Sequence, residues 1–203
     1  MYQKTVKRIL DVVLSGLAIL TLSPLFAVIA IWIKLDSKGP VLFRQTRIGI
    51  HKTQFEILKF RTMQQDAPSN VPTHMFADSH HWITRAGRFL RKSSLDELPQ
   101  LLQIFTGKMS IVGPRPALWN QYDLIAERDK YGANDVRPGL TGWAQVNGRD
   151  ALSVEEKARY DGEYTAHVTF GMDVTCIWKS VSTVVTRKGF SEGRRDDGQE
   201  NQK

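Results

Sequence analysis

The stretch SSLDELPQLLQIF, residues 93–105, carries the most informative pattern in this chain. Its apolar residues recur at helical spacing, which predicts an amphipathic helix. Ser94 followed three positions later by Glu97 fits a capping box, with Ser94 at the N-cap. Asp96 and Glu97 would then lie in the first turn, where unpaired backbone N–H groups and the helix dipole favour anions. Two interpretations stay open: carboxylates that only cap a helix, or a carboxylate pair with a chemical role.

Basic side chains accompany this acidic pair. Residues 85–92 (RAGRFLRK) predict a helix with a basic face, and Arg91 lies near its end. Attraction to anionic lipid headgroups explains such a face, and phosphate binding is the more specific explanation. Upstream, residues 55–63 predict a strand in which Lys59 and Arg61 share one face, because side chains alternate with a period of two. These two cations either hold phosphate oxygens or form a solvated edge.

Two segments rich in proline and glycine follow the helix. In GPRP, residues 113–116, two prolines restrict the backbone on both sides of Arg115, although a plain turn explains the motif equally. The second segment, RPGLTGWAQVNGR at 137–149, contains Arg137 and Arg149 as further phosphate-binding candidates. Its glycines would allow the backbone to approach a ligand closely, so an ordinary helix is not expected here. Neither a GxGxxG fingerprint nor the GKS/T of a P-loop occurs.

The N-terminal region contains an uncharged apolar run of 22 residues, 12–33. A helix that spans a bilayer needs about 20 residues. Pro24, preceded by Ser23, would divide the run into halves that are each too short to cross, and the Ser23 hydroxyl could satisfy a carbonyl freed by the proline. Basic residues flank both ends, which suits a re-entrant helix–break–helix better than a single span, because positive residues favour the cytoplasmic side. A single span and a buried helix of a soluble protein remain the alternatives.

Composition limits the classes of function. The 203 residues include 28 Lys and Arg against 21 Asp and Glu, a formal charge of +7, which indicates an anionic partner: nucleic acid, anionic lipid or a phosphorylated substrate. Cys176 is the single cysteine, so no intrachain disulfide can form. The long polar segment 64–81 is a candidate lid. Its adjacent His80 and His81 lack any HExxH or Cys/His ligand pattern, so a metal site is not favoured there.

Several short motifs occur in a fixed order, and together they identify a family. They are Ser23-Pro24, LKFRTM at 58–63, LDELPQL at 95–101, VGPRP at 112–116 and RPGLTGWAQVNGR at 137–149. With these motifs the chain resembles the monotopic phosphoglycosyl transferases, small bacterial sugar transferases that start glycan assembly on a polyprenyl phosphate. The resemblance extends from Lys7-Arg8 to about Phe190.

The resemblance implies a reaction and a site. It implies transfer of a sugar phosphate from a UDP-sugar to undecaprenyl phosphate, release of UMP, a Mg²⁺ cofactor and a covalent intermediate on Asp96. It also implies that Lys59, Arg91 and Arg115 are active-site cations. The acceptor phosphate is already an anion near neutral pH, since its second pKa is about 6, so Asp96 is not needed as a base. Nucleophile and metal ligand remain as its roles, and Glu97 would help to hold the metal.

The expected fold is α+β and mainly helical. The resemblance implies that residues 1–38 form a re-entrant membrane helix. Residues 39–190 are expected to form a small α/β catalytic domain with interfacial amphipathic helices, and residues 191–203 a disordered polar tail. Within the domain, helices are expected at 153–166 and 172–188. The resemblance places the domain on the cytoplasmic face of the bacterial inner membrane, as a minimal catalytic unit. Expected partners are the UDP-sugar, polyprenyl phosphate and membrane lipid, with a second copy of the chain as a further candidate and no nucleic acid.

Two rival functions can be distinguished by experiment. A membrane-anchored glycosyltransferase would transfer sugar without phosphate and release UDP, but the chain has no D-x-D stretch. A non-enzymatic basic module would bind nucleic acid or anionic lipid with strong salt dependence. That module explains the charge of +7 but not the adjacent Asp96 and Glu97.

Overall fold

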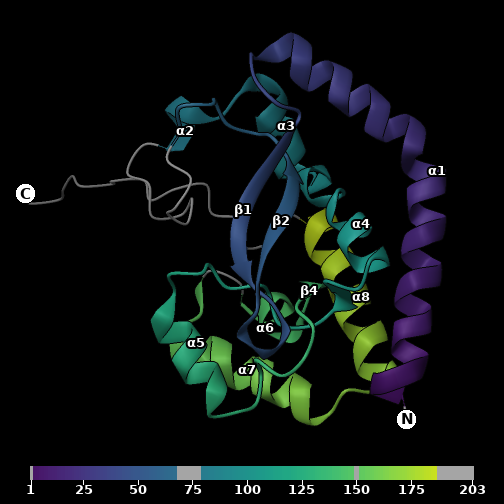
Figure 1. The fold of residues 1–203 in the computed structure, drawn as a ribbon, viewed down its shortest axis with the longest axis vertical. Coiled ribbons are helices and arrows are strands. Elements are labelled where there is room, and N and C mark those ends of the chain that lie inside the picture. Colours follow the sequence, from purple (N-terminus) through teal and green to yellow (C-terminus); the bar gives the residue numbers. More distant parts are fainter. Residues whose placement is uncertain (1, 68–78, 149–150, 187–203) are drawn as a thin grey trace, which may run out of the picture.

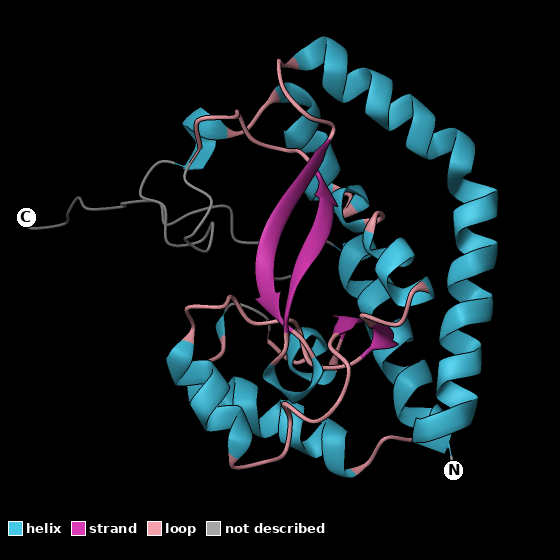
Figure 2. Cartoon of the chain, in the orientation of Figure 1, coloured by secondary structure: helices cyan, strands magenta, loops and turns pink. Residues whose placement is uncertain are grey.

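The computed structural model describes residues 2–67, 79–148 and 151–186. Helices dominate this part of the chain, as predicted (Figures 1 and 2). The α-helices are α1 (Lys7–Asp36), α2 (Ser79–Trp82), α3 (Arg85–Lys92), α4 (Gln100–Phe105), α5 (Tyr122–Asp129), α6 (Trp143–Val146), α7 (Val154–Ala166) and α8 (Phe170–Thr186). The strands are β1 (Leu42–Ile48), β2 (Gln54–Phe60), β3 (Ser110–Val112) and β4 (Gly139–Thr141). Shorter turns are the π-helix η1 (Tyr2–Val6) and the 3₁₀ helices η2 (Ile50–Lys52) and η4 (Leu95–Glu97).

Helix α1 is continuous through Pro24, so the predicted break is wrong at the level of secondary structure. Figure 1 shows instead a long helix that bends part-way along one side of the molecule. A proline bends a helix because it supplies no N–H to the carbonyl four residues earlier. That carbonyl belongs to Leu20, and the Ser23 hydroxyl donates to it at 2.8 Å. The polar compensation predicted for Ser23 is therefore present, and the helix continues past the proline.

One stripe of α1 packs against the rest of the fold. Ile29 and Ile33 are buried with Phe60 and Leu90, and Phe26 contacts both this cluster and a second one formed around α4. Elsewhere the helix is exposed: only 11% of its most apolar 18-residue window is buried. Among the described residues, α1 is the one helix long and apolar enough to cross a membrane by length and composition. Such exposure argues against the buried helix of a soluble protein.

Buried polar contacts join the N-terminal end of α1 to the domain. The Lys7 ammonium contacts the Asp173 carboxylate of α8 at 2.7 Å, and Tyr2 and Tyr164 donate to the same carboxylate at 2.6 and 2.7 Å. One turn further along α1, Asp11 accepts hydrogen bonds from the Ser110 hydroxyl and from a backbone N–H of β3. These charges are inside the fold, where only paired charges are tolerated.

The C-terminal end of α1 is fixed to the same domain. Asp36 accepts a hydrogen bond from the backbone N–H of Ala86 at 3.0 Å, in the first turn of α3. The buried Arg61 guanidinium donates to the carbonyls of Ser37 and Lys38, both at 2.7 Å. Both ends of the apolar helix therefore lie against one body, as Figure 1 also shows.

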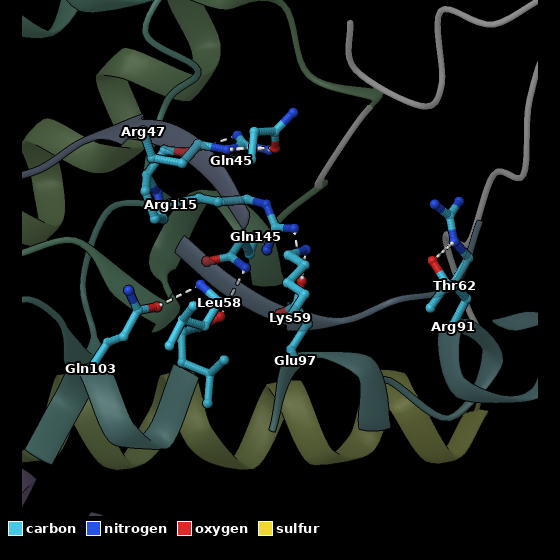
Figure 3. Close-up of polar contacts among 12 residues, drawn as sticks. Gln45, Arg47, Leu58, Lys59, Thr62, Arg91, Glu97, Gln103, Arg115 and Gln145 are labelled. Carbon is cyan, nitrogen blue, oxygen red and sulfur yellow. Dashed lines mark hydrogen bonds and ion pairs between the residues drawn. The ribbon is translucent and has the colours of Figure 1, made fainter. Parts of the chain in front are cut away.

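A hairpin and α4 together form the support for the Asp96-Glu97 turn. Strands β1 and β2 pair antiparallel, with Phe43 opposite Lys59 and Gln45 opposite Ile57. The side-chain amide of Gln103, on α4, accepts from the backbone N–H of Leu58 at 2.9 Å, as an additional strand would (Figure 3). This contact holds α4 and the turn before it against β2.

Glycines allow the two proline-rich segments to pack backbone on backbone. Strands β3 and β4 pair parallel, with Ser110 opposite Gly139. A Cβ on Gly139 would lie 2.1 Å from the backbone nitrogen of Gly113, and one on Gly142 would lie 2.1 Å from the Gly113 carbonyl oxygen. The close approach that these glycines permit is thus between chain segments rather than toward a ligand. The same stretch also contains the short helix α6, which was not expected.

The predicted helix over 93–105 is wrong in its first half. A 3₁₀ turn, η4, comes first, and α4 begins only at Gln100. Ser94 has φ 57° and ψ 15°, and its side chain makes no capping hydrogen bond. An N-cap residue needs an extended conformation, whereas the short connection from α3 turns the chain through the left-handed region at Ser94. A capping box does occur elsewhere, between Ser153 and Glu156 at the start of α7.

Other predicted boundaries shift slightly. The helix expected at 153–166 is α7, and the last helix begins two residues earlier than expected, at Phe170. Strand β2 ends at Phe60, so Lys59 and Arg61 do not share a strand face. Most of the candidate lid, residues 68–78, and the tail at 191–203 lie outside the described residues.

Candidate active site

The Asp96-Glu97 turn faces cations from two other elements. One Glu97 carboxylate oxygen accepts from the Lys59 ammonium of β2 at 2.7 Å and from the Arg115 guanidinium at 2.9 Å (Figure 3). The side chains of Lys59 and Glu97 are 16% and 18% exposed, and that of Arg115 is 43% exposed. The structure therefore brings together three of the predicted site residues, with Arg115 open toward solvent.

Charge rather than burial decides the ionisation of Glu97. Burial raises the pKa of this carboxyl, but Arg115 and Lys59 lower it more, so that its pKa lies well below the usual range. Burial also lowers the pKa of the Lys59 ammonium, while Glu97 opposes that shift. Glu97 thus stabilises both cations, which repel each other, and fixes their positions.

Asp96 is in a different state from its neighbour. Its carboxylate is partly exposed, and within the described part of the chain it accepts no hydrogen bond. Burial raises the pKa of Asp96 to about 6, whereas the charges of Lys59, Arg91 and Arg115 oppose that rise. Asp96 is therefore largely ionised at neutral pH, and its oxygens are not engaged by a neighbouring donor. A carboxylate with these properties can act as a nucleophile or as a metal ligand.

Arg47 is a site cation that the sequence analysis missed. Its guanidinium donates to the Gln45 side chain at 2.6 and 3.0 Å and to the carbonyl of Pro116 at 3.0 Å (Figure 3). Burial and the neighbouring charge of Arg115 lower the pKa of Arg47 to about 9, so it stays charged at neutral pH. The signal that could have found it is the hairpin register, which places Arg47 on the same face as Lys59.

Arg91 approaches the site from α3. It donates to the Thr62 hydroxyl at 2.8 Å, and Figure 3 shows this pair to one side of the Lys59–Glu97–Arg115 group. The close packing of α3 on this segment needs Gly87, since an added Cβ there would lie 1.9 Å from the Thr62 carbonyl oxygen. From this position the charge of Arg91 favours the ionised form of Asp96 and lowers its pKa, less strongly than the charge of Lys59 does.

The other predicted phosphate-binding arginines are not in this cluster. Arg61 is buried at the end of α1, where its two terminal nitrogens donate to the carbonyls of Ser37 and Lys38 and to the Ser37 hydroxyl. Arg137 donates to the carbonyl of Gly107 at 3.0 Å, next to the end of α4. Arg149 lies outside the described residues. Two of the three thus hold helix ends, a use of arginine that sequence spacing does not reveal.

The two carboxylates, Asp96 and Glu97, fit a Mg²⁺ site only together with a substrate. In the described ranges no group of three or more His, Cys, Asp or Glu side chains could hold a metal. Mg²⁺ commonly binds through one or two carboxylates, substrate phosphates and several waters. Asp96, which accepts no hydrogen bond from the described residues, and the second oxygen of Glu97 fit that donor set. These two residues would hold the ion.

Comparison with known proteins identifies the family. The family model for bacterial sugar transferases matches residues 2–187. The chain belongs to the bacterial sugar transferase family. It is 39% identical to the UDP-glucose:undecaprenyl-phosphate glucose-1-phosphate transferase of Escherichia coli K12, over 88% of this chain and 40% of the relative. It is 38% identical to the uncharacterized sugar transferase EpsL of Bacillus subtilis 168, over 83% of this chain and 80% of that protein.

Further members of the bacterial sugar transferase family differ in length and in the sugar they are named for. A UDP-N-acetylgalactosamine-undecaprenyl-phosphate N-acetylgalactosaminephosphotransferase of Aeromonas hydrophila is 36% identical over 91% of this chain and 44% of its own length. The exopolysaccharide production protein ExoY of Rhizobium meliloti 1021 is 34% identical, over 90% of this chain and 87% of its own length. The chain thus spans less than half of the Escherichia and Aeromonas relatives but most of the Bacillus and Rhizobium ones.

Proposed function

We propose that this chain transfers a sugar 1-phosphate from a UDP-sugar to undecaprenyl phosphate, releasing UMP, as a membrane step of polysaccharide or glycoconjugate assembly. The observation that carries the proposal is the state of Asp96. It is an ionised carboxylate, accepts no hydrogen bond from the described residues, and lies in the field of Lys59, Arg91 and Arg115. The names of several relatives support the same general reaction.

In the first step, an Asp96 oxygen attacks the phosphorus that carries the sugar. The bond from that phosphorus to the bridging oxygen breaks, UMP leaves with the electron pair, and an acyl phosphate forms on Asp96. An anion attacks an anion here, so the positive charge of Lys59, Arg115 and Arg47 lowers the barrier. Arginine also binds phosphate oxygens in a bidentate manner, which fixes the direction of attack.

In the second step, an oxygen of the acceptor phosphate attacks the same phosphorus and restores the Asp96 carboxylate. No base is needed, because the acceptor is already ionised near neutral pH. The two steps use one site in turn, so two large anions need not occupy it together. Bound Mg²⁺, held by Asp96 and Glu97, would neutralise charge on the diphosphate. Glu97 keeps Lys59 and Arg115 in position for both steps.

The membrane arrangement that supports this reaction is re-entrant. Both ends of α1 are bonded to one domain, which is difficult for a helix that crosses a bilayer and easy for one that enters and leaves the same leaflet. One face of α8 is also exposed and apolar, at helical spacing: Phe170, Val174, Ile177, Trp178 and Val181. We place this face in the membrane interface, on the cytoplasmic side of the inner membrane, where the acceptor head group lies.

Product analysis tests the proposal. Purified protein in nanodiscs with undecaprenyl phosphate, Mg²⁺ and a panel of UDP-sugars is expected to release UMP with at least one donor. Asp96→Asn is expected to release none, while Asp135→Asn, which changes an exposed carboxylate outside the site, keeps normal activity. Release of UDP instead of UMP, or full activity of Asp96→Asn, would contradict the proposal.

A further inference from the structure

Two aromatic rings lie exposed where the C-terminal part of α1 meets α3. The rings of Trp32 and Phe89 are 5.4 Å apart between centroids and tilted by 50°. Trp32 is 38% exposed and Phe89 is 53% exposed. Their sequence neighbours Ile33 and Leu90 are buried in the contact between the two helices. The aromatic pair is therefore held rigidly at the rim of a packed interface, with ring surface open to its surroundings.

Exposed cations surround this pair. On α3, Phe89 shares its exposed face with Arg85, Arg88 and Lys92, at helical spacing. At the end of α1, Lys34 and Lys38 are exposed as well. The opposite side of α3 packs inward through Ala86, Gly87 and Leu90. We call the pair Trp32 and Phe89, together with Arg85, Arg88 and Lys92, the aromatic–cationic rim.

The rim connects an apolar surface with the site. Along α1, the exposed side chains of Val28, Ile31 and Leu35 continue the apolar surface from Trp32. In the other direction, α3 also carries Arg91, which bonds to Thr62 and acts on the charge of Asp96. A single short helix thus presents cations outward at the rim and, on another side, Arg91 bonded to Thr62 within the electrostatic reach of Asp96.

This combination fits an anionic amphiphile with a long apolar chain. Aromatic rings and aliphatic side chains bind hydrocarbon, and clustered arginine and lysine bind phosphate. We propose that the aromatic–cationic rim is the docking surface for the polyprenyl phosphate acceptor. Its isoprenoid chain lies on Trp32 and Phe89 and along α1, and the cations of α3 guide its phosphate toward Asp96. The proposal rests on the proposed function, because it names where that reaction takes its acceptor.

Charge and position favour the acceptor over bulk anionic lipid as the occupant. Bulk lipid would be attracted equally to any exposed cation near the interface. The rim instead joins its cations to an aromatic pair and lies on the helix that directly precedes η4 and Asp96. A phosphate that docks there is held by the helix that leads into the turn of the proposed nucleophile.

A photocrosslinking experiment tests this assignment without any need for activity. Phe89→p-benzoylphenylalanine is irradiated in nanodiscs that contain phosphatidylglycerol and a small mole fraction of undecaprenyl phosphate. The adducts are weighed by intact-protein mass spectrometry. Among the adducts at position 89, undecaprenyl phosphate is expected to be enriched about tenfold or more over its mole fraction in the lipid. A tenfold enrichment corresponds to a binding preference of about 1.4 kcal/mol. Trp178→p-benzoylphenylalanine, on the exposed face of α8, is expected to capture each lipid in proportion to its mole fraction. Proportional capture at position 89 would overturn the proposal.

Kinetics supply the second test. Trp32→Ala and Phe89→Ala are expected to raise the KM for undecaprenyl phosphate about tenfold each. The rate of phosphosugar attachment to Asp96 in the absence of acceptor, and flotation with liposomes, are expected to stay unchanged. Tyr122→Ala, which removes an exposed ring from α5, serves as the control. Loss of flotation, or an unchanged KM for the acceptor, would overturn the proposal.

The two tests also separate this inference from the proposed function. If the wild-type protein neither acquires a phosphosugar nor releases UMP, the proposed function fails, and the crosslink at position 89 still decides whether the rim selects polyprenyl phosphate. If UMP is released but position 89 captures only bulk lipid, the proposed function stands and the docking surface is wrong.

Discussion

The buried contact between Lys7 and Asp173 is expected to be a main attachment of α1 to the domain. The two charges are 2.7 Å apart, with side chains only 11% and 8% exposed. Asp173→Asn removes the negative charge and leaves the Lys7 ammonium buried without its ion-pair partner. Removing one partner of a buried pair costs about 3–5 kcal/mol. For a chain of this size, Tm falls by roughly 2–4 °C for each kcal/mol lost, so a loss of about 3 kcal/mol lowers Tm by roughly 6–12 °C.

Removing the other partner of the pair, Lys7, is expected to cost less stability. In Lys7→Met the Asp173 carboxylate still accepts hydrogen bonds from Tyr2 and Tyr164, so a cost of about 1–2 kcal/mol is expected. In the double variant neither charge remains, so the loss is expected to be smaller than the sum of the single losses by about 1–3 kcal/mol.

Thermal unfolding in one detergent, followed by circular dichroism, measures all three variants. Arg44→Met is the matched control, because Arg44 pairs with Glu56 at 3.5 Å with both side chains exposed by 60% or more. Exposed pairs contribute about 0–1 kcal/mol, so its Tm should change by at most about 4 °C. Equal shifts for Asp173→Asn and Arg44→Met, or strictly additive single effects, would refute the reasoning.

Three further predictions concern the membrane helix and the site. Pro24→Ala restores the missing N–H to α1 and is expected to straighten the helix into a membrane span. A cysteine introduced into that variant as Gln3→Cys is then expected to be labelled from outside the cell. Purely cytoplasmic labelling would show that Pro24 does not set the topology. Arg115→Lys is expected to lower kcat/KM about 10²–10³-fold, since it removes a bidentate phosphate contact, whereas Arg137→Lys should stay within about threefold; equal losses would contradict the site described here. EDTA is expected to stop UMP release and added Mg²⁺ to restore it, and activity that persists in EDTA would exclude a role for the metal.

Local patterns predicted the elements that depend on nearby residues. The apolar run predicted α1, the basic segment predicted α3, and the pattern of residues 153–166 predicted α7. Helical periodicity depends only on residues a few positions apart, so a local pattern is enough to detect it. Part of the site was predicted for a different reason. Lys59 and Glu97 belong to separate motifs, and the family resemblance assigned both motifs to one active site. The structure adds the geometry, with Glu97 bonded to both Lys59 and Arg115.

Tertiary partners account for what could not be predicted. Arg47 needed the register of β1 on β2 before it could be placed on the same face as Lys59. Arg61 was predicted to share a strand face with Lys59, but strand β2 ends before Arg61. The Arg61 guanidinium instead donates to carbonyls at the end of α1. The role of Asp173 was hidden because its partners Tyr2 and Lys7 lie more than 160 positions away in the sequence. A sequence pattern shows residue type and spacing, whereas these roles depend on which distant atoms meet.

The measurement that tests the central claim most directly is intact-protein mass spectrometry after mixing purified protein with Mg²⁺ and UDP-sugars, without acceptor. The account predicts a mass increase equal to one sugar phosphate with the correct donor, absent in Asp96→Asn and lost from the wild-type protein when undecaprenyl phosphate is added. The donor that produces the adduct also identifies the sugar. UMP release that requires the acceptor, with no adduct on the wild-type chain at any time, would contradict a covalent intermediate on Asp96.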